Sequence, residues 1–246
     1  MVSRIILCMG DIRMFYYDPT MILVIPAMIF AIIAQGMVNS AFSRYSKVRA
    51  RSGITGEQVA RYLANVNGLN VSVNEVRGTL SDHYDPIKKT INLSSEIYRG
   101  TSIAALSVAA HETGHAVQDK TGYGFLRFRH ALLPVTQIGS NLAIPLFIIG
   151  MLLSAGASSS LGWLLMDVGI IFFTFAVLFQ IITLPVEFNA SARARQMLVK
   201  AGFISGDEEY GVKSMLNAAA MTYVASTAVA VMQLLRLLVL RGNRRD

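Results

Sequence analysis

SIAALSVAAHETGHAVQD, the stretch from Ser102 to Asp119, decides how the rest of the chain is interpreted. Inside it, His111 and His115 are four residues apart and Glu112 lies between them, which makes an HExxH pattern. On a helix, residues four apart share one face, so both imidazoles can bind one metal ion. Zinc suits this arrangement, because a catalytic zinc takes three protein ligands and leaves a position for water. The pattern predicts that Glu112 accepts a proton from this activated water, which then attacks a peptide carbonyl.

The residues around this pattern are apolar on nearly every side of the expected helix. Such a helix is typically buried. Buried histidine and glutamate side chains need partners, and a metal ion is the simplest one. Thr101 or Ser102 can serve as the N-cap after Gly100. The stretch therefore predicts a buried metal-binding helix.

The composition places this helix in a membrane protein. The hydrophobic fraction is 53% and the mean hydropathy is +0.48, both high for a water-soluble domain. About 20 predominantly apolar residues suffice to cross a bilayer. Four stretches meet this requirement, and we expect a mainly α, polytopic protein with transmembrane helices at residues 20–38, 132–154, 161–186 and 218–240.

Basic residues gather beside these stretches, so the formal net charge of +7 indicates membrane topology and not nucleic-acid binding. More basic residues follow the first span than precede it, which predicts that residues 39–131 are cytoplasmic. The uncharged link 155–160 suits the outer side. Basic residues after the fourth span would favour a cytoplasmic C-terminus, so that helix is predicted to be either transmembrane or interfacial. These residues are Arg241, Arg244 and Arg245.

We expect residues 1–19 to form an extension before the first span, which acts as a signal anchor. The predicted cytoplasmic segment is expected to fold as a small α+β unit. A capping box at Thr55 to Gln58 predicts a helix. NVSVNEV alternates at period two, and DHYDPIKKTINLS predicts strand, turn and strand, so we expect a small antiparallel sheet. Its edge strand either binds an extended substrate backbone or is an ordinary structural hairpin. The candidate residues are Thr90, Ile91, Asn92 and Leu93.

The third metal ligand has to come from outside the HExxH pattern. A metzincin would have Gly and His where this chain has Gln118 and Thr121, so that class is rejected. Asp119 lies a second helical turn beyond His111, which suits support of a ligand better than ligation. His83 and His130 remain open as ligands, although each more often occupies a turn or a surface.

Glu187 is a better placed ligand, because a carboxylate at the edge of the hydrocarbon region needs a partner. It lies in LPVEFNASARARQMLVKAG, where Pro185 suits the first turn of a helix and Gly202 its end. We therefore expect a separate cytoplasmic helix within residues 187–217. Charges also occur inside the spans at Asp167 and Arg236, where snorkelling or hydration near the span ends is a sufficient explanation.

Eight motifs resemble the neutral zinc metallopeptidases of bacterial membranes, the YugP-type proteins, from about Met14 to Leu240. These motifs are FYYDPT, YSKV, SGITGEQVAR, SDHYDP, INLSSEIY, IAALSVAAHETGHAVQ, TLPVEFNASARA and LNAAAMTYVA. The resemblance implies a multi-pass protein of the bacterial cell membrane. Because residues 1–13 fall outside the family pattern, both Met1 and Met14 are candidate starts.

The resemblance also implies a distant likeness to the gluzincins, including HtpX and the CAAX prenyl proteases, in which a later ExxxD-type motif supplies the third ligand. Carried over by position, His111, His115 and Glu187 would bind Zn²⁺ and Glu112 would be the general base. The chain has Ser191 where that motif has aspartate, so Asn189 or Ser191 is expected to support a histidine.

Hydrolysis also needs a donor for the developing oxyanion. Tyr223, His83 and Tyr84 are candidates, although each is more often structural. The sequence thus predicts a zinc endopeptidase at the cytoplasmic membrane surface that acts on a protein or peptide, in particular a membrane-associated one. The alternative is a zinc-stabilised scaffold or assembly factor, which would have no use for Glu112 as a base. A metal transporter would place its ligands inside the spans, whereas His111 and His115 lie outside them.

Overall fold

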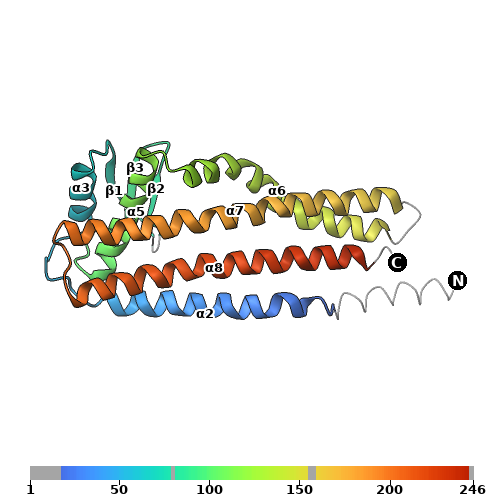
Figure 1. The fold of residues 1–246 in the computed structure, drawn as a ribbon, viewed down its shortest axis with the longest axis horizontal. Coiled ribbons are helices and arrows are strands. Elements are labelled where there is room, and N and C mark those ends of the chain that lie inside the picture. Colours follow the sequence, from blue (N-terminus) through green and yellow to red (C-terminus); the bar gives the residue numbers. More distant parts are fainter. Residues whose placement is uncertain (1–17, 79–80, 155–158, 244–246) are drawn as a thin grey trace.

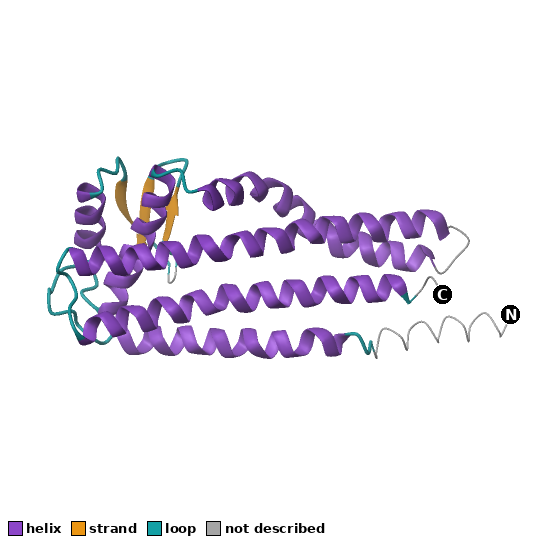
Figure 2. Cartoon of the chain, viewed as in Figure 1, coloured by secondary structure: helices purple, strands orange, loops and turns teal. Residues whose placement is uncertain are grey.

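The computed structural model describes residues 18–78, 81–154 and 159–243. Most of the predicted extension 1–19, both candidate starts and most of the link 155–160 lie outside these ranges. The described chain contains four helices that are long and apolar enough to cross a membrane. The four predicted spans lie within them, apart from Thr20, which directly precedes the first helix, and this agreement confirms a mainly α, polytopic fold (Figures 1 and 2). They are α2 (Met21–Tyr45), α6 (Gly124–Ser154), α7 (Ser159–Lys200) and α8 (Asp207–Gly242).

The long helices form two packed pairs, α6 with α7 and α2 with α8, and α7 also packs on α8. The smaller elements gather at one end of this bundle (Figure 1). The start of α2 and the end of α8 lie toward the opposite end. Because α8 runs beside α2 for most of its length, the arrangement favours a spanning helix over an interfacial one.

The outer surfaces of the long helices suit contact with lipid, since large apolar side chains such as Ile22 and Ile32 are about 70% exposed. Two ion pairs lie at the far end among the residues that the structure describes. Arg236 donates to Asp18, and Arg241 donates to Asp167 through two nitrogens at 2.7 and 2.9 Å. Snorkelling alone is therefore the wrong explanation for Asp167 and Arg236, because each has a partner on another segment.

Two capping interactions define helix starts in the soluble segment. Thr55 and Gln58 form the predicted capping box at the start of α3 (Gly56–Val66). The Ser102 hydroxyl accepts a hydrogen bond from the Ala105 amide at the start of α5 (Ile103–Lys120), the helix that carries HExxH. A short helix, α4 (Ser95–Arg99), precedes it. These caps satisfy amides that the helices leave unpaired.

The sheet has three strands in the order β1 (Ser72–Val76), β3 (Thr90–Ser94), β2 (His83–Asp85). β2 and β3 form the predicted antiparallel hairpin, but β1 runs parallel to β3, so the prediction of a wholly antiparallel sheet is wrong. The edge-strand prediction is also wrong, because Thr90, Ile91, Asn92 and Leu93 belong to the central strand. Burial explains the order: Ile91 and Leu93 are fully buried, whereas β1 and β2 are more exposed.

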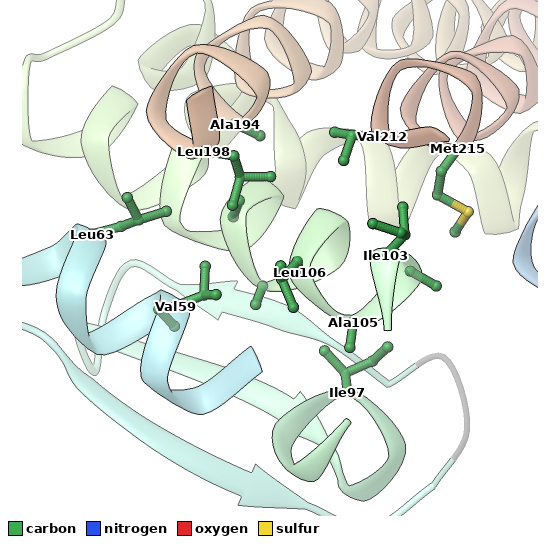
Figure 3. Packing of buried hydrophobic residues seen from close by; sticks show 14 of the residues in the cluster. Val59, Leu63, Ile97, Ile103, Ala105, Leu106, Ala194, Leu198, Val212 and Met215 are labelled. Atoms are coloured by element: carbon green, nitrogen blue, oxygen red, sulfur yellow. The ribbon is translucent and has the colours of Figure 1, made fainter. Parts of the chain in front are cut away.

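Helix α5 lies within the main hydrophobic core (Figure 3). Ile103, Leu106 and Ala110 on this helix are almost completely buried. The core around them contains side chains from α3, the sheet, α4 and the ends of α7 and α8 nearest the sheet. The HExxH helix is therefore held by packing on several sides.

Helix α7 continues through Pro185 to Lys200, so no new helix begins at this proline. Val186, Ala190, Ala194 and Leu198 explain this continuity, because they recur every four residues and are all fully buried. This apolar face holds the helix together although proline removes one backbone hydrogen bond. The predicted unit 187–217 instead comprises the end of α7, a turn and the start of α8.

The α5 and α7 backbones touch within the HExxH motif. A Cβ atom added to Gly114 would lie 2.7 Å from the Ala190 carbonyl oxygen. Real Cβ atoms essentially never approach an oxygen so closely, so only glycine fits. Glycine and alanine at this contact bring the two helices together beside His111, His115 and Glu187.

Gly114→Ala is expected to destabilise the protein by about 1–3 kcal/mol, as overpacking of a close contact does. Gly36→Ala is the control, because a Cβ at this helical glycine meets nothing within 4 Å. Thermal unfolding in detergent should show a lower Tm for Gly114→Ala alone. An unchanged Tm would contradict the close contact.

Candidate metal centre

Three predicted ligands meet between α5 and α7. The Glu187 Oε2 atom lies 3.3 Å from His111 Nε2 and 3.6 Å from His115 Nε2. One ligand atom from each of the three side chains lies within 4.8 Å of the others. Ligands around a tetrahedral zinc ion are about 3.3 Å apart, given bonds of about 2.0–2.1 Å. The spacing and the donor types therefore fit zinc.

Each histidine ring has a second partner that orients it. His115 Nδ1 lies 3.0 Å from Gln118 Oε1, while the Gln118 amide donates to the Val186 carbonyl and to Asn189 Oδ1. This pattern assigns the proton of neutral His115 to Nδ1 and leaves the Nε2 lone pair for a metal. His111 Nδ1 lies 3.2 Å from Ser191 Oγ. Thus Ser191 contacts one ring directly, and Asn189 reaches the other through Gln118.

Gln118 and Arg129 are two residues that sequence reasoning missed. Gln118 is fully buried, and it was considered only as a mismatch to the metzincin pattern. Arg129 Nη1 donates to Glu187 Oε1 at 3.0 Å, leaving Oε2 toward the imidazoles. The start of α6 carries Arg129 close to α7, a proximity that no sequence spacing indicates. Gln118 could have been found from its position one turn beyond His115.

A cavity of about 240 Å³ opens beside the three ligands, and Glu112 lines it with them. Glu112 is only 8% exposed. Among the residues that the structure describes, its carboxylate has no hydrogen-bond or ion-pair partner. A poorly solvated carboxylate on this cavity is placed to accept a proton from a molecule bound there.

The residues predicted as hydrogen-bond donors to the oxyanion differ in their surroundings. Tyr223, from α8, lines the cavity. His83 also lines it, but its Nδ1 lies 2.8 Å from the Ser81 carbonyl and its Nε2 lies 3.1 Å from Asn92 Nδ2. Both nitrogens of His83 are thus engaged in the hairpin. His130 lies at the same cavity but outside the three-residue ligand group.

Asp119 lies outside the ligand group as well and binds the hairpin. Its Oδ2 accepts hydrogen bonds from Tyr84 and Lys89 at 2.6 and 2.5 Å. Burial raises the pKa of Asp119, but these two hydrogen bonds outweigh burial and hold the pKa below its usual value. Burial and the bond to Asp119 raise the pKa of Tyr84. Asp119 therefore fixes β2 and β3 against the end of α5.

Replacing Gln118 with methionine removes the acceptor for His115 while keeping an unbranched side chain. Loss of such a partner typically lowers metal affinity 10–100-fold, so a chelator should remove zinc from Gln118→Met at correspondingly lower concentration. Gln196→Met, at an exposed position of α7, is the matched control. Equal zinc affinity in wild type and a folded Gln118→Met protein would contradict the orienting role.

Comparison with known proteins identifies the family of the chain. The model of a family described as "Putative neutral zinc metallopeptidase" matches residues 20–242. The chain is 49% identical over 225 residues to a protein of Bacillus subtilis (strain 168) described as "Putative membrane protease YugP". The match covers 91% of this chain and 97% of that protein. No solved structure matches. The chain therefore belongs to the neutral zinc metallopeptidase family, as its sequence motifs predicted.

Proposed function

We propose that the protein is a membrane-embedded zinc-dependent endopeptidase of the gluzincin type, with His111, His115 and Glu187 as ligands. The observation that carries this proposal is the Glu112 carboxylate, which lines the ligand cavity without a protein partner in the described chain. A glutamate with a purely structural role at 8% exposure would be expected to have a hydrogen-bond partner. The position of Glu112 therefore supports a catalytic role of the metal centre over the alternative, a zinc-stabilised scaffold.

Three residues of the chain have separate roles in the proposed hydrolysis of a peptide bond. When bound, zinc supplies Lewis acidity that acidifies water and polarises a carbonyl. Glu112 accepts the proton from the attacking water and returns it to the leaving amine. Tyr223, which lines the cavity from α8, is the candidate donor to the oxyanion. Arg129 holds Glu187 in place through its Oε1 atom.

The cavity walls favour a peptide substrate at the membrane. Its lining includes His83 and Tyr84 of β2, an edge strand whose outer side has no neighbouring strand in the described part of the chain. An extended peptide can add to such an edge through backbone hydrogen bonds. Leu133 and Phe179, from the spanning helices α6 and α7, line the same cavity. The proposed substrates are therefore membrane-associated proteins or peptides, and β2 replaces Thr90–Leu93 as the proposed binding strand.

We place the soluble segment in the cytoplasm, because Arg44 lies in the last turn of α2 and Lys47 and Arg49 follow this helix. Four crossings then put the end of α8 outside. Pairing of Arg241 with Asp167 offsets part of the opposing charge at that end.

Alkaline phosphatase fused after Gly242 should be active in intact bacteria, because this enzyme folds only outside the cytoplasm. The same reporter fused after Tyr45 should be inactive, and green fluorescent protein should give the reverse result. An inactive phosphatase at Gly242, with a fluorescent reporter there, would place the end of α8 in the cytoplasm and contradict this topology.

Glu112→Gln should abolish cleavage of casein by detergent-purified protein while zinc stays bound. Loss of a general base lowers the rate by about 10²–10⁴-fold. Glu96→Gln, at an exposed glutamate, is the control for loss of one negative charge. His111→Ala should lose both zinc and activity. If Glu112→Gln retained zinc and cleaved casein as fast as wild type, Glu112 would not be the base.

A further inference from the structure

A groove between α2 and α8, separate from the metal centre, has a volume of about 670 Å³. It lies where these helices approach the soluble segment. We propose that this groove binds one anionic phospholipid, with the headgroup at its cationic end and an acyl chain along its apolar end. This binding is independent of whether the metal centre is catalytic.

The cationic end contains Arg44 from α2 and Lys213 from α8. In the described ranges, neither side chain forms an ion pair with a carboxylate. Two of the three acids at the start of α8 are engaged elsewhere: Glu208 accepts a hydrogen bond from the Arg51 amide, and Glu209 pairs with Arg195. Two exposed cations without carboxylate partners fit a phosphate diester.

Polar groups continue the groove beyond the cations. Ser40 on α2 and Asn217 on α8 both line it. Each is one helical turn from its cation, Ser40 before Arg44 and Asn217 after Lys213, so both lie on the bilayer side. A hydroxyl and an amide at this depth can donate to the glycerol and ester oxygens of a phospholipid.

The opposite end of the groove is apolar. Ile33 and Met37 from α2 and Met221 from α8 line it. Gly36 lies between them, and a Cβ added there would meet nothing within 4 Å, so the space beside this glycine is open. A change from cations through polar groups to apolar side chains matches the order of groups along a phospholipid.

The groove also lies at the expected depth in the membrane. The apolar part of α2 ends near Val38, and Arg44 follows about two turns later. Basic pockets between spanning helices on the cytoplasmic side bind anionic headgroups. A soluble anion would not use the apolar end, so charge and shape together favour a lipid.

Native mass spectrometry of the full-length protein in detergent tests the proposal, with dioleoyl phosphatidylglycerol and dioleoyl phosphatidylcholine as probes. Wild type should bind one phosphatidylglycerol in preference to phosphatidylcholine. The double variant Arg44→Gln and Lys213→Gln should bind phosphatidylglycerol roughly 25-fold more weakly, because each cation contributes about fivefold. Lys47→Gln with Lys88→Gln removes the same charge from exposed positions outside the groove and should bind as wild type does.

Gly36→Phe tests the apolar end, because its ring would fill the space of the acyl chain and should weaken phosphatidylglycerol binding without changing charge. Equal affinity of wild type and the Arg44, Lys213 double variant would overturn the proposal. Equal affinity for the two lipids would do so too. A dimer that is present in wild type and lost in Gly36→Phe would assign the groove to a second copy of the chain instead.

Discussion

The contact between the α5 and α7 backbones at Gly114 and Ala190 is the constraint on which the metal centre depends. Glycine at position 114 allows an approach that any side chain would block. His115 adjoins this glycine, and Glu187 precedes Ala190 by about one helical turn, so the contact brings ligands from two distant segments within bonding distance of one ion. Larger side chains at the contact would move the two helix axes apart and separate the imidazoles from the carboxylate.

The rest of the fold holds this contact rigid and provides hydrogen-bond partners for the buried polar side chains beside it. The hydrophobic core surrounds α5, while α7 runs unbroken from the far end of the bundle into the soluble segment. Polar groups inside this apolar setting are costly unless each has a partner. Gln118, Ser191 and Arg129 supply those partners, and Glu112 stands apart as a carboxylate left available at the cavity. In the described part of the chain, the architecture that gives His111, His115 and Glu187 their partners therefore leaves the Glu112 carboxylate without one.

Local patterns predicted the features that depend on local spacing. HExxH predicted two histidines on one face of a helix, and apolar runs predicted the spans. A carboxylate at a span end pointed to Glu187, which lies beside both histidines in the structure. The strand order could not be predicted this way, because alternation shows which strands exist but not which strand is central. Arg129 was missed for a similar reason, since its contact with Glu187 depends on how α6 packs on α7. Pro185 suggested a helix start, yet the buried face from Val186 to Leu198 outweighed the local preference.

X-ray absorption at the zinc edge, on protein purified with its metal, tests the central claim most directly. The account predicts one zinc per chain, bound by two imidazole nitrogens and by oxygen at about 2.0–2.1 Å, without sulfur. Glu187→Gln should alter the oxygen shell while the imidazole signal persists. Zinc bound through sulfur, or an absorption spectrum unchanged by Glu187→Gln, would contradict a centre assembled from α5 and α7.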